Sequence, residues 1–361
     1  MMQDKQSTEP NRDGAATSGG AKKLRWSLVS LAIAGLTIWA VTSQWKNYSF
    51  REFLDFVSRA DLRWLAAAVC AMLGFIAFEG CAIHGACRAL HYNVPLRRHF
   101  RYAAADIYFS AITPSASGGQ PACALLMMRD GIPGIVTTAV LLLTLAMYAL
   151  SILAIGGLCL LLKPSMLSVF GAPSRVLIAV GFALQVGLAA FFFLLVRSEK
   201  LLEGICRGTL HLLARLHILH DEARRREKLD ATMAEYARCV ALLSGHRSML
   251  LRSFLYNLLQ RASQIAVTML VFLAMGGQPR LAGSIFAMQS FVVIGSNCVP
   301  IPGAMGVADY LMLDGFNAFL PQDQGISMEL LSRSVSFYSC VLLCGLTVLV
   351  TLYQMRKAAR K

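Results

Sequence analysis

The residue with the clearest chemical potential is Arg261, because it lies about ten residues into an apolar stretch. At the helical rise of 1.5 Å per residue this depth is about 15 Å, close to the middle of a bilayer. Asn257, Gln260, Gln264 and Thr268 recur around it at helical spacing, which predicts one polar stripe on this helix. An arginine in hydrocarbon costs at least about 2.5–3.5 kcal/mol, so we expect an anionic partner for it, either a phosphate or a carboxylate.

Two carboxylates in other apolar segments are candidates for that partner. Glu79 lies in the stretch Trp64–Cys87, and Asp106 lies in the segment 100–131. One interpretation is a permanent ion pair between Arg261 and either carboxylate. The alternative is that Glu79 or Asp106 binds and releases protons, because ionisable groups inside a membrane often belong to proton pathways.

Two segments rich in Pro and Gly interrupt otherwise apolar sequence. Residues 113–121 read TPSASGGQP, and residues 299–306 read VPIPGAMG. Helices that begin after these breaks, near Gln120 and Val307, would offer free N–H groups to an anion. The residues expected to hold a lipid phosphate, together with Arg261, are Ser115, Ser117, Gly118, Gly119, Gln120, Pro302, Gly303 and Gly306. A plainer interpretation, in which Pro and Gly only form the turns, stays open.

The composition identifies the environment of these residues. The chain has 361 residues, of which 56% are apolar and 15% are charged, whereas soluble proteins average about 45–50% and about 25%. This excludes an ordinary soluble enzyme, a disulfide-rich secreted protein and a disordered protein. It predicts an all-α polytopic membrane protein. The net charge of +14 fits basic loops on the cytoplasmic side, and we expect no nucleic-acid partner.

Six stretches have about the length of a spanning helix, which needs about 20 mostly apolar residues. They are Trp26–Ser43, Trp64–Cys87, Pro133–Leu162, Val176–Val196, Leu250–Met275 and Met328–Tyr353. The broken segments, about 100–131 and 282–320, are too long for one crossing. We predict two re-entrant helical hairpins there, since non-helical backbone at membrane depth needs protein or a wet cavity around it. Two short full crossings in each segment are the alternative.

The order of these elements repeats along the chain. Each half contains two spans, a broken hairpin and a further span, first over residues 22–162 and then over residues 176–196 and 250–355. An external loop at 163–175 joins the halves. Three crossings per half invert the second half, and inverted repeats with broken helices are typical of transporters.

The distribution of basic residues predicts the orientation. With a cytoplasmic N-terminus, 25 of the 34 Lys and Arg residues fall on the cytoplasmic side and seven on the external side, as the positive-inside rule requires. The cytoplasmic segments include a disordered tail at residues 1–21 and a basic linker at residues 197–249. Both termini are therefore expected in the cytoplasm.

Metal and cofactor chemistry have little support in the sequence. None of the ten Cys residues forms a C-x-x-C pair, so they are expected to pack between helices as small apolar residues. His217 and His220 lie in a charged segment without a supporting Cys or second His pair. We expect no bound metal and no cofactor.

The two broken segments also carry a resemblance to a known family. Residues 113–121, followed by DGIP at 130–133, resemble the first signature of the lysylphosphatidylglycerol synthase transmembrane family, whose members have a flippase-like domain. Residues 300–309, PIPGAMGVAD, resemble its second signature. The family usually carries Glu where this chain has Asp309, so the carboxylate is kept with a reach one methylene group shorter. By this resemblance Asp309 is a further candidate for a coupling or ion-pair carboxylate.

The resemblance covers about residues 24–355 and implies a protein of the bacterial or archaeal cytoplasmic membrane, often dimeric. In full-length members, the multiple peptide resistance factors, a cytosolic domain transfers an aminoacyl group from tRNA to phosphatidylglycerol. The membrane part is implicated in moving the product to the outer leaflet. This chain ends at Lys361, just past the last span, so we expect the catalytic domain to be absent.

Three functions follow as expectations. The first is a flippase-like transporter that moves an anionic or aminoacylated phospholipid, such as lysylphosphatidylglycerol, or a polyprenyl-phosphate lipid between leaflets. The second is a phosphatidylglycerol lysyltransferase, against which the expected absence of the catalytic domain argues. The third is a non-catalytic membrane partner of a separate synthase or glycosyltransferase. The expected partners are a membrane phospholipid, a second copy of the chain and a separate lipid-modifying enzyme.

Overall fold

The fold was obtained as a computed structural model, which describes residues 58–113, 116–197, 203–204, 208, 234–243, 245, 247–299 and 301–358. These residues form helices and loops, and no strand occurs among them, as the hydropathy predicts. They belong to one compact unit, Phe50–Lys361. The predicted span Trp26–Ser43 and the predicted tail at 1–21 lie outside the described residues.

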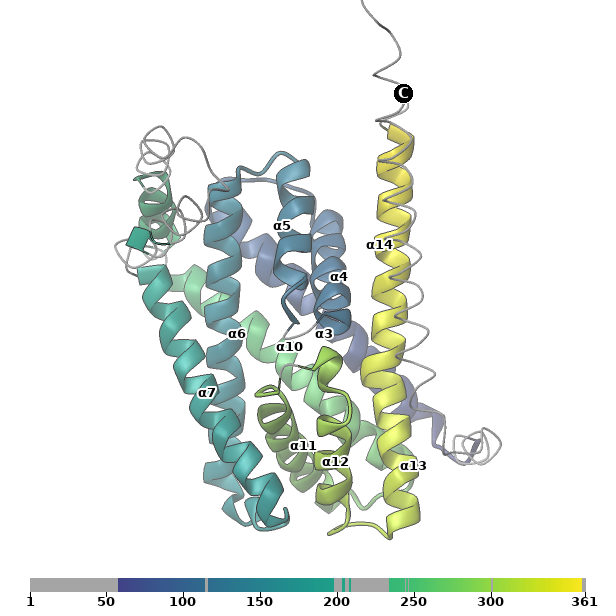
Figure 1. Cartoon of the computed structure of the whole chain (residues 1–361). Helices are drawn as coiled ribbons and strands as arrows, with labels where there is room; N and C mark the ends of the chain where they lie inside the picture. The colour runs from purple at the N-terminus through teal and green to yellow at the C-terminus, as the bar shows by residue number, and fades with distance from the viewer. Residues whose placement is uncertain are drawn as a thin grey trace, which may run out of the picture. The chain divides into compact units, whose positions relative to one another are not determined.

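Five helices of the described part are long and apolar enough to cross a membrane. They are α3 (Leu62–Ala89), α6 (Gly134–Leu162), α7 (Ala172–Arg197), α10 (Arg247–Ala274) and the run formed by α13 (Gln322–Arg333) and α14 (Ser339–Ala358). Each overlaps one of the predicted spans. Figure 1 shows that they extend along a common direction, which agrees with a bundle that crosses a bilayer.

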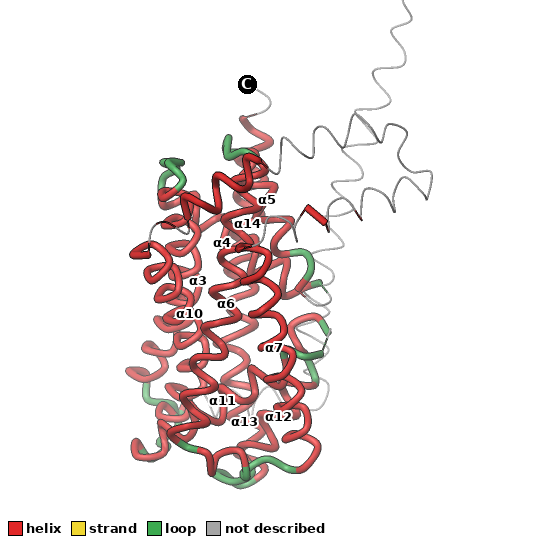
Figure 2. Tube along the Cα trace, turned by 90° about the vertical axis from the view of Figure 1, so that its left-hand side faces the viewer, coloured by secondary structure: helices red, strands yellow, loops and turns green. Residues whose placement is uncertain are grey.

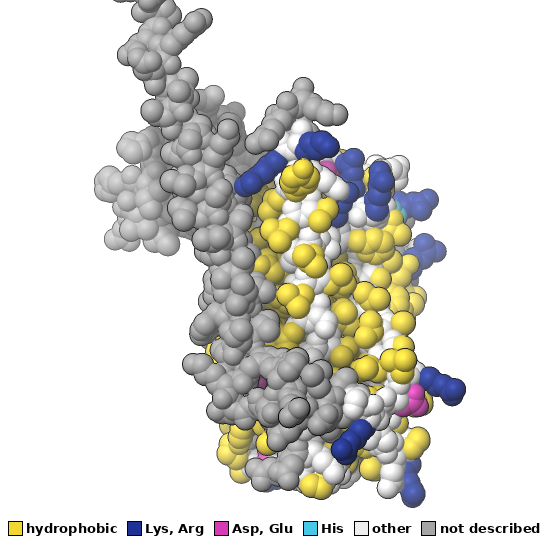
Figure 3. Space-filling model, turned by 90° about the vertical axis from the view of Figure 1, so that its right-hand side faces the viewer, with side chains coloured by type: hydrophobic (Ala, Val, Ile, Leu, Met, Phe, Trp, Pro, Cys, Tyr) yellow, Lys and Arg dark blue, Asp and Glu magenta, His cyan; other side chains and the backbone are white. Residues whose placement is uncertain are grey.

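The spanning helices differ in how much protein covers them. In an apolar stretch of 18 residues in α10, the mean hydropathy is 1.2 and 56% of the residues are buried. In the corresponding stretch of α7, the mean hydropathy is 2.4 and 17% of the residues are buried. The more polar helix is therefore central, and the more apolar helix lies at the periphery, with Leu184, Leu188 and Phe191 exposed. On the face in Figure 3, apolar side chains cover the middle of the described surface, and Lys and Arg lie toward its two ends. Contact with lipid acyl chains is favourable for such an apolar surface, whereas contact with water is not.

Each predicted broken segment consists of two helices that are shorter than the five candidate spanning helices. The first contains α4 (Leu96–Ile112) and α5 (Gly119–Arg129), and the second contains α11 (Ala282–Ser296) and α12 (Val307–Phe316). The longest, with 17 residues, measures about 26 Å. Figures 1 and 2 show the α4–α5 pair beside one end of the long helices and the α11–α12 pair beside the other end.

The two breaks use glycine in different ways. In the second break, Gly303 and Gly306 have φ angles of 59° and 80°, which non-glycine residues rarely adopt. In the first break, Gly118 has φ −84°, a value that any residue can adopt. Gly119 is instead required by close approach, because a Cβ atom would meet the side chains of Asp106 and Ser110.

A π-helical segment, η6 (Ser334–Tyr338), connects α13 to α14 in the middle of the last span. It follows Arg333 directly and contacts α3 and α10. Such wide turns occur preferentially at functional sites. The segment therefore directs attention to the side chains around Arg333.

Part of the predicted linker packs on the bundle. Residues 234–243 are helical, and Tyr236, Cys239 and Leu243 join the buried cluster formed with residues of α3, α5 and α6. The Tyr236 hydroxyl donates to the Leu195 carbonyl oxygen at 3.1 Å. This portion of the linker is therefore anchored to the bundle, while much of the remainder lies outside the described residues.

Candidate functional site

Arg261 lies in the protein interior between aromatic side chains. Its side chain stands over the Tyr148 ring of α6 at 4.1 Å and the Phe75 ring of α3 at 5.1 Å, measured from the guanidinium carbon to each ring centroid. Its Nη1 donates to Gln264 Oε1 at 2.6 Å. The residue is 8% exposed, and its Nε has no hydrogen-bond partner among the described residues. Aromatic faces stabilise the cation and leave donors of the guanidinium available to an anion.

Two carboxyl groups meet close to Arg261, one from α3 and one from α4. Glu79 and Asp106 are 5% and 7% exposed, and their side chains are close enough to interact with each other. Both also interact electrostatically with Arg261. Among the ion pairs of the described residues, none joins Arg261 to either carboxylate within 4.0 Å. The predicted proximity is therefore present, and a direct ion pair is not.

Amide and hydroxyl donors surround these carboxyl groups. Gln260 Nε2 donates to Glu79 Oε2 at 2.7 Å, and Gln120 Nε2 donates to Asp106 Oδ2 at 2.7 Å. Ser110 Oγ donates to Asp106 Oδ1 at 3.2 Å. Because Gln120 is at the start of α5, the tip of the first broken pair rests directly on the carboxyl pair.

The polar stripe predicted on α10 faces the protein interior. Asn257, Gln260 and Thr268 are each at most 2% exposed. Thr268 Oγ1 is 2.7 Å from Ser332 Oγ of α13, and Asn257 Nδ2 donates to the Ser253 carbonyl oxygen at 2.9 Å. The stripe therefore connects α10 to α3 through Gln260 and to the last span through Thr268.

A second polar cluster lies at the break between α11 and α12. Arg333 Nε is 2.8 Å from Asp309 Oδ1 and 4.0 Å from Glu329 Oε1. Arg333 Nη2 also donates to the Gly303 carbonyl oxygen at 3.5 Å. Asp309 Oδ2 accepts the Gly306 N–H at 2.8 Å, which caps α12. Asp309, which the family resemblance indicates as a possible ion-pair carboxylate, thus forms an ion pair with Arg333.

The predicted phosphate-binding residues divide into groups with different surroundings. Gly119 and Gln120 lie against Asp106, whereas Ser117 is exposed and Gly118 donates its N–H to Thr113 Oγ1 at 2.9 Å. Ser115 lies outside the described residues. In the second break, the Gly306 N–H and the Gly303 carbonyl oxygen already have protein partners, and Pro302 begins the adjoining 3-10 turn. The polar groups named here thus have protein partners in both breaks, whereas Arg261 keeps an unpartnered Nε donor.

Sequence reasoning missed the role of Arg333. Its side chain interacts more closely with Asp309, 24 positions earlier in the chain, than with Glu329, four positions earlier. One signal was available, because Arg333, like Arg261, lies inside an apolar span. Tyr148 and Phe75 gave no signal, since aromatic residues are common in such spans.

The base of the first broken pair is joined by a third group of side chains. Asp130, the first residue of the DGIP sequence, forms an ion pair with Arg98 at 3.3 Å and accepts a hydrogen bond from the Tyr102 hydroxyl. Arg98 and Tyr102 belong to α4, and Asp130 follows α5. These contacts hold the two arms together at their base, which gives this part of the motif a structural role.

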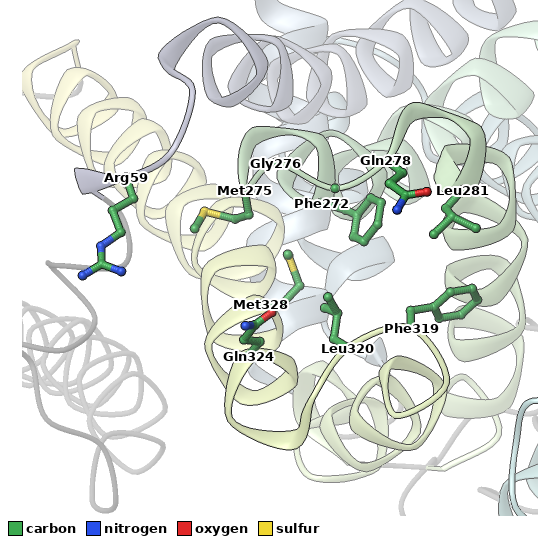
Figure 4. A pocket seen from close by; sticks show the side chains of 11 residues that line it. Arg59, Phe272, Met275, Gly276, Gln278, Leu281, Phe319, Leu320, Gln324 and Met328 are labelled. Carbon is green, nitrogen blue, oxygen red and sulfur yellow. The ribbon is translucent and has the colours of Figure 1, made fainter.

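A pocket of about 440 Å³ opens at the base of the second broken pair. Leu281 precedes α11, Phe319 follows α12, and Phe272 and Met328 form further apolar parts of the lining. Gln278 and Gln324 add amide groups to it, as Figure 4 shows. The lining suits an amphiphile, because it contains both apolar and hydrogen-bonding side chains.

The described residues contain no group of three or more His, Cys, Asp or Glu side chains that could hold a metal ion. Nine cysteines in this part of the chain are free thiols.

Comparison with known proteins gives one family. The model of the family described as "Lysylphosphatidylglycerol synthase TM region" matches residues 27–344. No curated protein matches the chain.

Proposed function

The chain belongs to the lysylphosphatidylglycerol synthase TM family, and from this premise we propose that it is a flippase-like lipid transporter. The substrate is an anionic or aminoacylated phospholipid, such as lysylphosphatidylglycerol, or a polyprenyl-phosphate lipid. These lipids share a phosphate group, which is the part that a buried guanidinium recognises. The protein acts in the cytoplasmic membrane of a bacterium or archaeon, with both termini in the cytoplasm.

The observation that carries this proposal is the state of Arg261. A buried arginine that serves only structure normally donates directly to a carboxylate, because buried guanidinium donors without an acceptor are costly. Arg261 is buried, has aromatic neighbours, retains an unpartnered Nε and forms no close ion pair with Glu79 or Asp106. This arrangement supports a site that is completed by the phosphate of a transient ligand.

The broken helix pairs support a transport route to that site. In the proposal α4–α5 and α11–α12 are re-entrant hairpins that open from the cytoplasmic and the external side, respectively. Their arms are shorter than the spanning helices and lie beside opposite ends of the bundle, which supports this part of the proposal. Alternating movement of the two hairpins would expose the interior to one leaflet at a time. The pocket at the base of α11–α12 is then the external mouth of the route.

The test measures leaflet exchange of fluorescent phosphatidylglycerol in vesicles that contain the purified protein. Wild-type protein is expected to exchange the lipid faster than protein-free vesicles do. Arg261→Ala should reduce the rate at least tenfold, because removal of a charge-assisted hydrogen bond costs about 1.5–3 kcal/mol. Arg261→Lys should retain part of the rate, since it keeps the charge and loses the fork of donors.

The matched control is Arg252→Ala, which removes an exposed arginine from the same helix and is expected to leave the rate unchanged. Wild-type exchange no faster than in empty vesicles would refute the transport proposal. Equal rates in Arg261→Ala and wild type would remove the arginine from it.

A further inference from the structure

The carboxyl pair Glu79–Asp106 has a feature that lipid binding alone does not require. Its two side chains are buried and interact with each other, yet an ionised carboxylate offers only acceptors. Two neighbouring buried carboxyl groups favour a state in which they share one proton, because two adjacent negative charges repel each other in a low-dielectric interior. Other carboxyl oxygens of the pair accept hydrogen bonds from three donors, which are Gln260 of α10, Gln120 of α5 and Ser110 of α4.

The charges around the pair balance when it holds one proton. The pair then carries one negative charge, and Arg261 carries one positive charge. The other titratable groups that face the pair are thiols, contributed by Cys123 of α5 and by Cys340 and Cys344 of α14. The interior is thus neutral without a lipid. A phosphodiester bound at Arg261 would add one negative charge to a region of low dielectric constant, where an uncompensated charge is costly.

A second proton on the pair would restore neutrality. We propose that Glu79 and Asp106 form a proton-binding site that takes up one proton for each anionic lipid phosphate bound at Arg261. The inference rests on the proposed function and adds its energy source. The proton comes from the aqueous side to which the site is open, binds a carboxylate oxygen, and leaves when the lipid leaves. For a lipid with one net negative charge, such as phosphatidylglycerol, proton and lipid move together, so the step is electroneutral and responds to a pH gradient rather than to the membrane potential.

The position of the pair explains how its protonation reaches a moving part. Gln120 begins α5 and donates to Asp106, and a Cβ atom on Gly119 would collide with Asp106 and Ser110. Asp106 loses an acceptor when it is protonated, which weakens its hold on the tip of α5. The number of protons on the pair would therefore bias the first hairpin between its closed and open positions.

The experiment uses vesicles that contain the full chain, in sodium-free buffer, with fluorescent phosphatidylglycerol and an imposed pH difference. Wild-type exchange is expected to be several times faster when lipid moves from the acidic to the alkaline side than in the opposite direction. A potassium diffusion potential at equal pH should leave the rate unchanged. Glu79→Gln and Asp106→Asn should each abolish the directional difference.

The control is Asp314→Asn, which removes a carboxylate that accepts the Gly171 N–H at 2.8 Å, away from the pair. It should keep the directional difference. Wild-type exchange that is equal in both directions would overturn proton coupling and leave the transport proposal standing. Exchange no faster than in empty vesicles would instead refute transport.

The infrared difference spectrum of the wild-type protein tests the proton site without relying on transport or on folding of the variants. At neutral pH, wild-type protein should show the carbonyl band of a protonated carboxylic acid, and this band should grow when dispersed phosphatidylglycerol is added. Glu79→Gln should remove part of it. Absence of the band from the wild-type spectrum, or a band indifferent to the lipid, would refute the proposed site.

Discussion

Two buried arginines in the described part illustrate how the same side chain can have different surroundings. Arg261 is held between Tyr148 and Phe75 and lacks a close carboxylate partner, whereas Arg333 lies 2.8 Å from Asp309. The first arrangement leaves guanidinium donors available, and the second uses the charge to fix a break in the backbone. We therefore assign ligand binding to Arg261 and a positioning role to Arg333.

The assignment for Arg333 predicts a large loss of stability. Its side chain and that of Asp309 are 9% and 14% exposed, and removal of one partner from a buried ion pair costs about 3–5 kcal/mol. Arg333→Ala should therefore lower the thermal unfolding temperature of the purified protein markedly. Arg98→Ala removes the half-exposed pair with Asp130, with exposures of 40% and 30%, and should cost at most about 1 kcal/mol. Equal shifts for the two variants would show that the Arg333 pair contributes little.

At the scale of elements, the first broken pair depends on close contact between α4 and the start of α5. Gly119 allows this contact because it has no Cβ atom, and Gln120 then reaches Asp106. The second broken pair depends on glycines with positive φ and on the Asp309 cap instead. The two tips are thus built differently even though they occupy corresponding positions in the element order.

Gly119→Ala should disturb the first hairpin selectively. An added Cβ atom would lie 2.6 Å from the Asp106 carbonyl oxygen, among other contacts, and overpacking of this kind costs about 1–3 kcal/mol. We expect slower lipid exchange and a lower unfolding temperature. Gly157→Ala is the control, because a Cβ atom there meets nothing within 4 Å. If both variants behaved as wild type, close contact at Gly119 would not be important.

At the scale of the whole described unit, the main feature is that the two broken pairs lie beside opposite ends of the long helices. An inverted repeat predicts this arrangement. The proposed route follows from it, because each hairpin then controls access from a different side. The proposal further states that the α4–α5 end lies on the cytoplasmic side of the membrane and the α11–α12 end on the external side.

Thiol labelling of intact cells tests that relation. Arg129 ends α5 and Arg280 precedes α11, and both are exposed. In a variant without native cysteines, Arg280→Cys should react with a membrane-impermeant reagent added outside. Arg129→Cys should react only after the membrane is permeabilised, as should the control Arg356→Cys near the end of α14. Labelling of positions 129 and 280 from the same side would contradict opposed hairpins.

Hydropathy and composition by themselves predicted much of this fold. Apolar stretches of helical length can lie only in lipid or in a large core, so α3, α6, α7, α10 and the final span were predictable. Pro and Gly cannot continue a helix without cost, so both breaks were predictable as well. The polar stripe of α10 followed from helical periodicity, and its inward orientation agrees with the expectation.

Only the tertiary structure decided which polar groups meet. Glu79 pairs with Asp106 across α3 and α4, and Arg333 pairs with Asp309 across α13 and α12, although the sequence equally allowed Arg261 to pair with either of the first two. Rotation and tilt of a helix in a membrane depend on packing against its neighbours and not on its own hydropathy. The chain alone therefore determines how deep a polar side chain lies, and packing determines which partner it has at that depth.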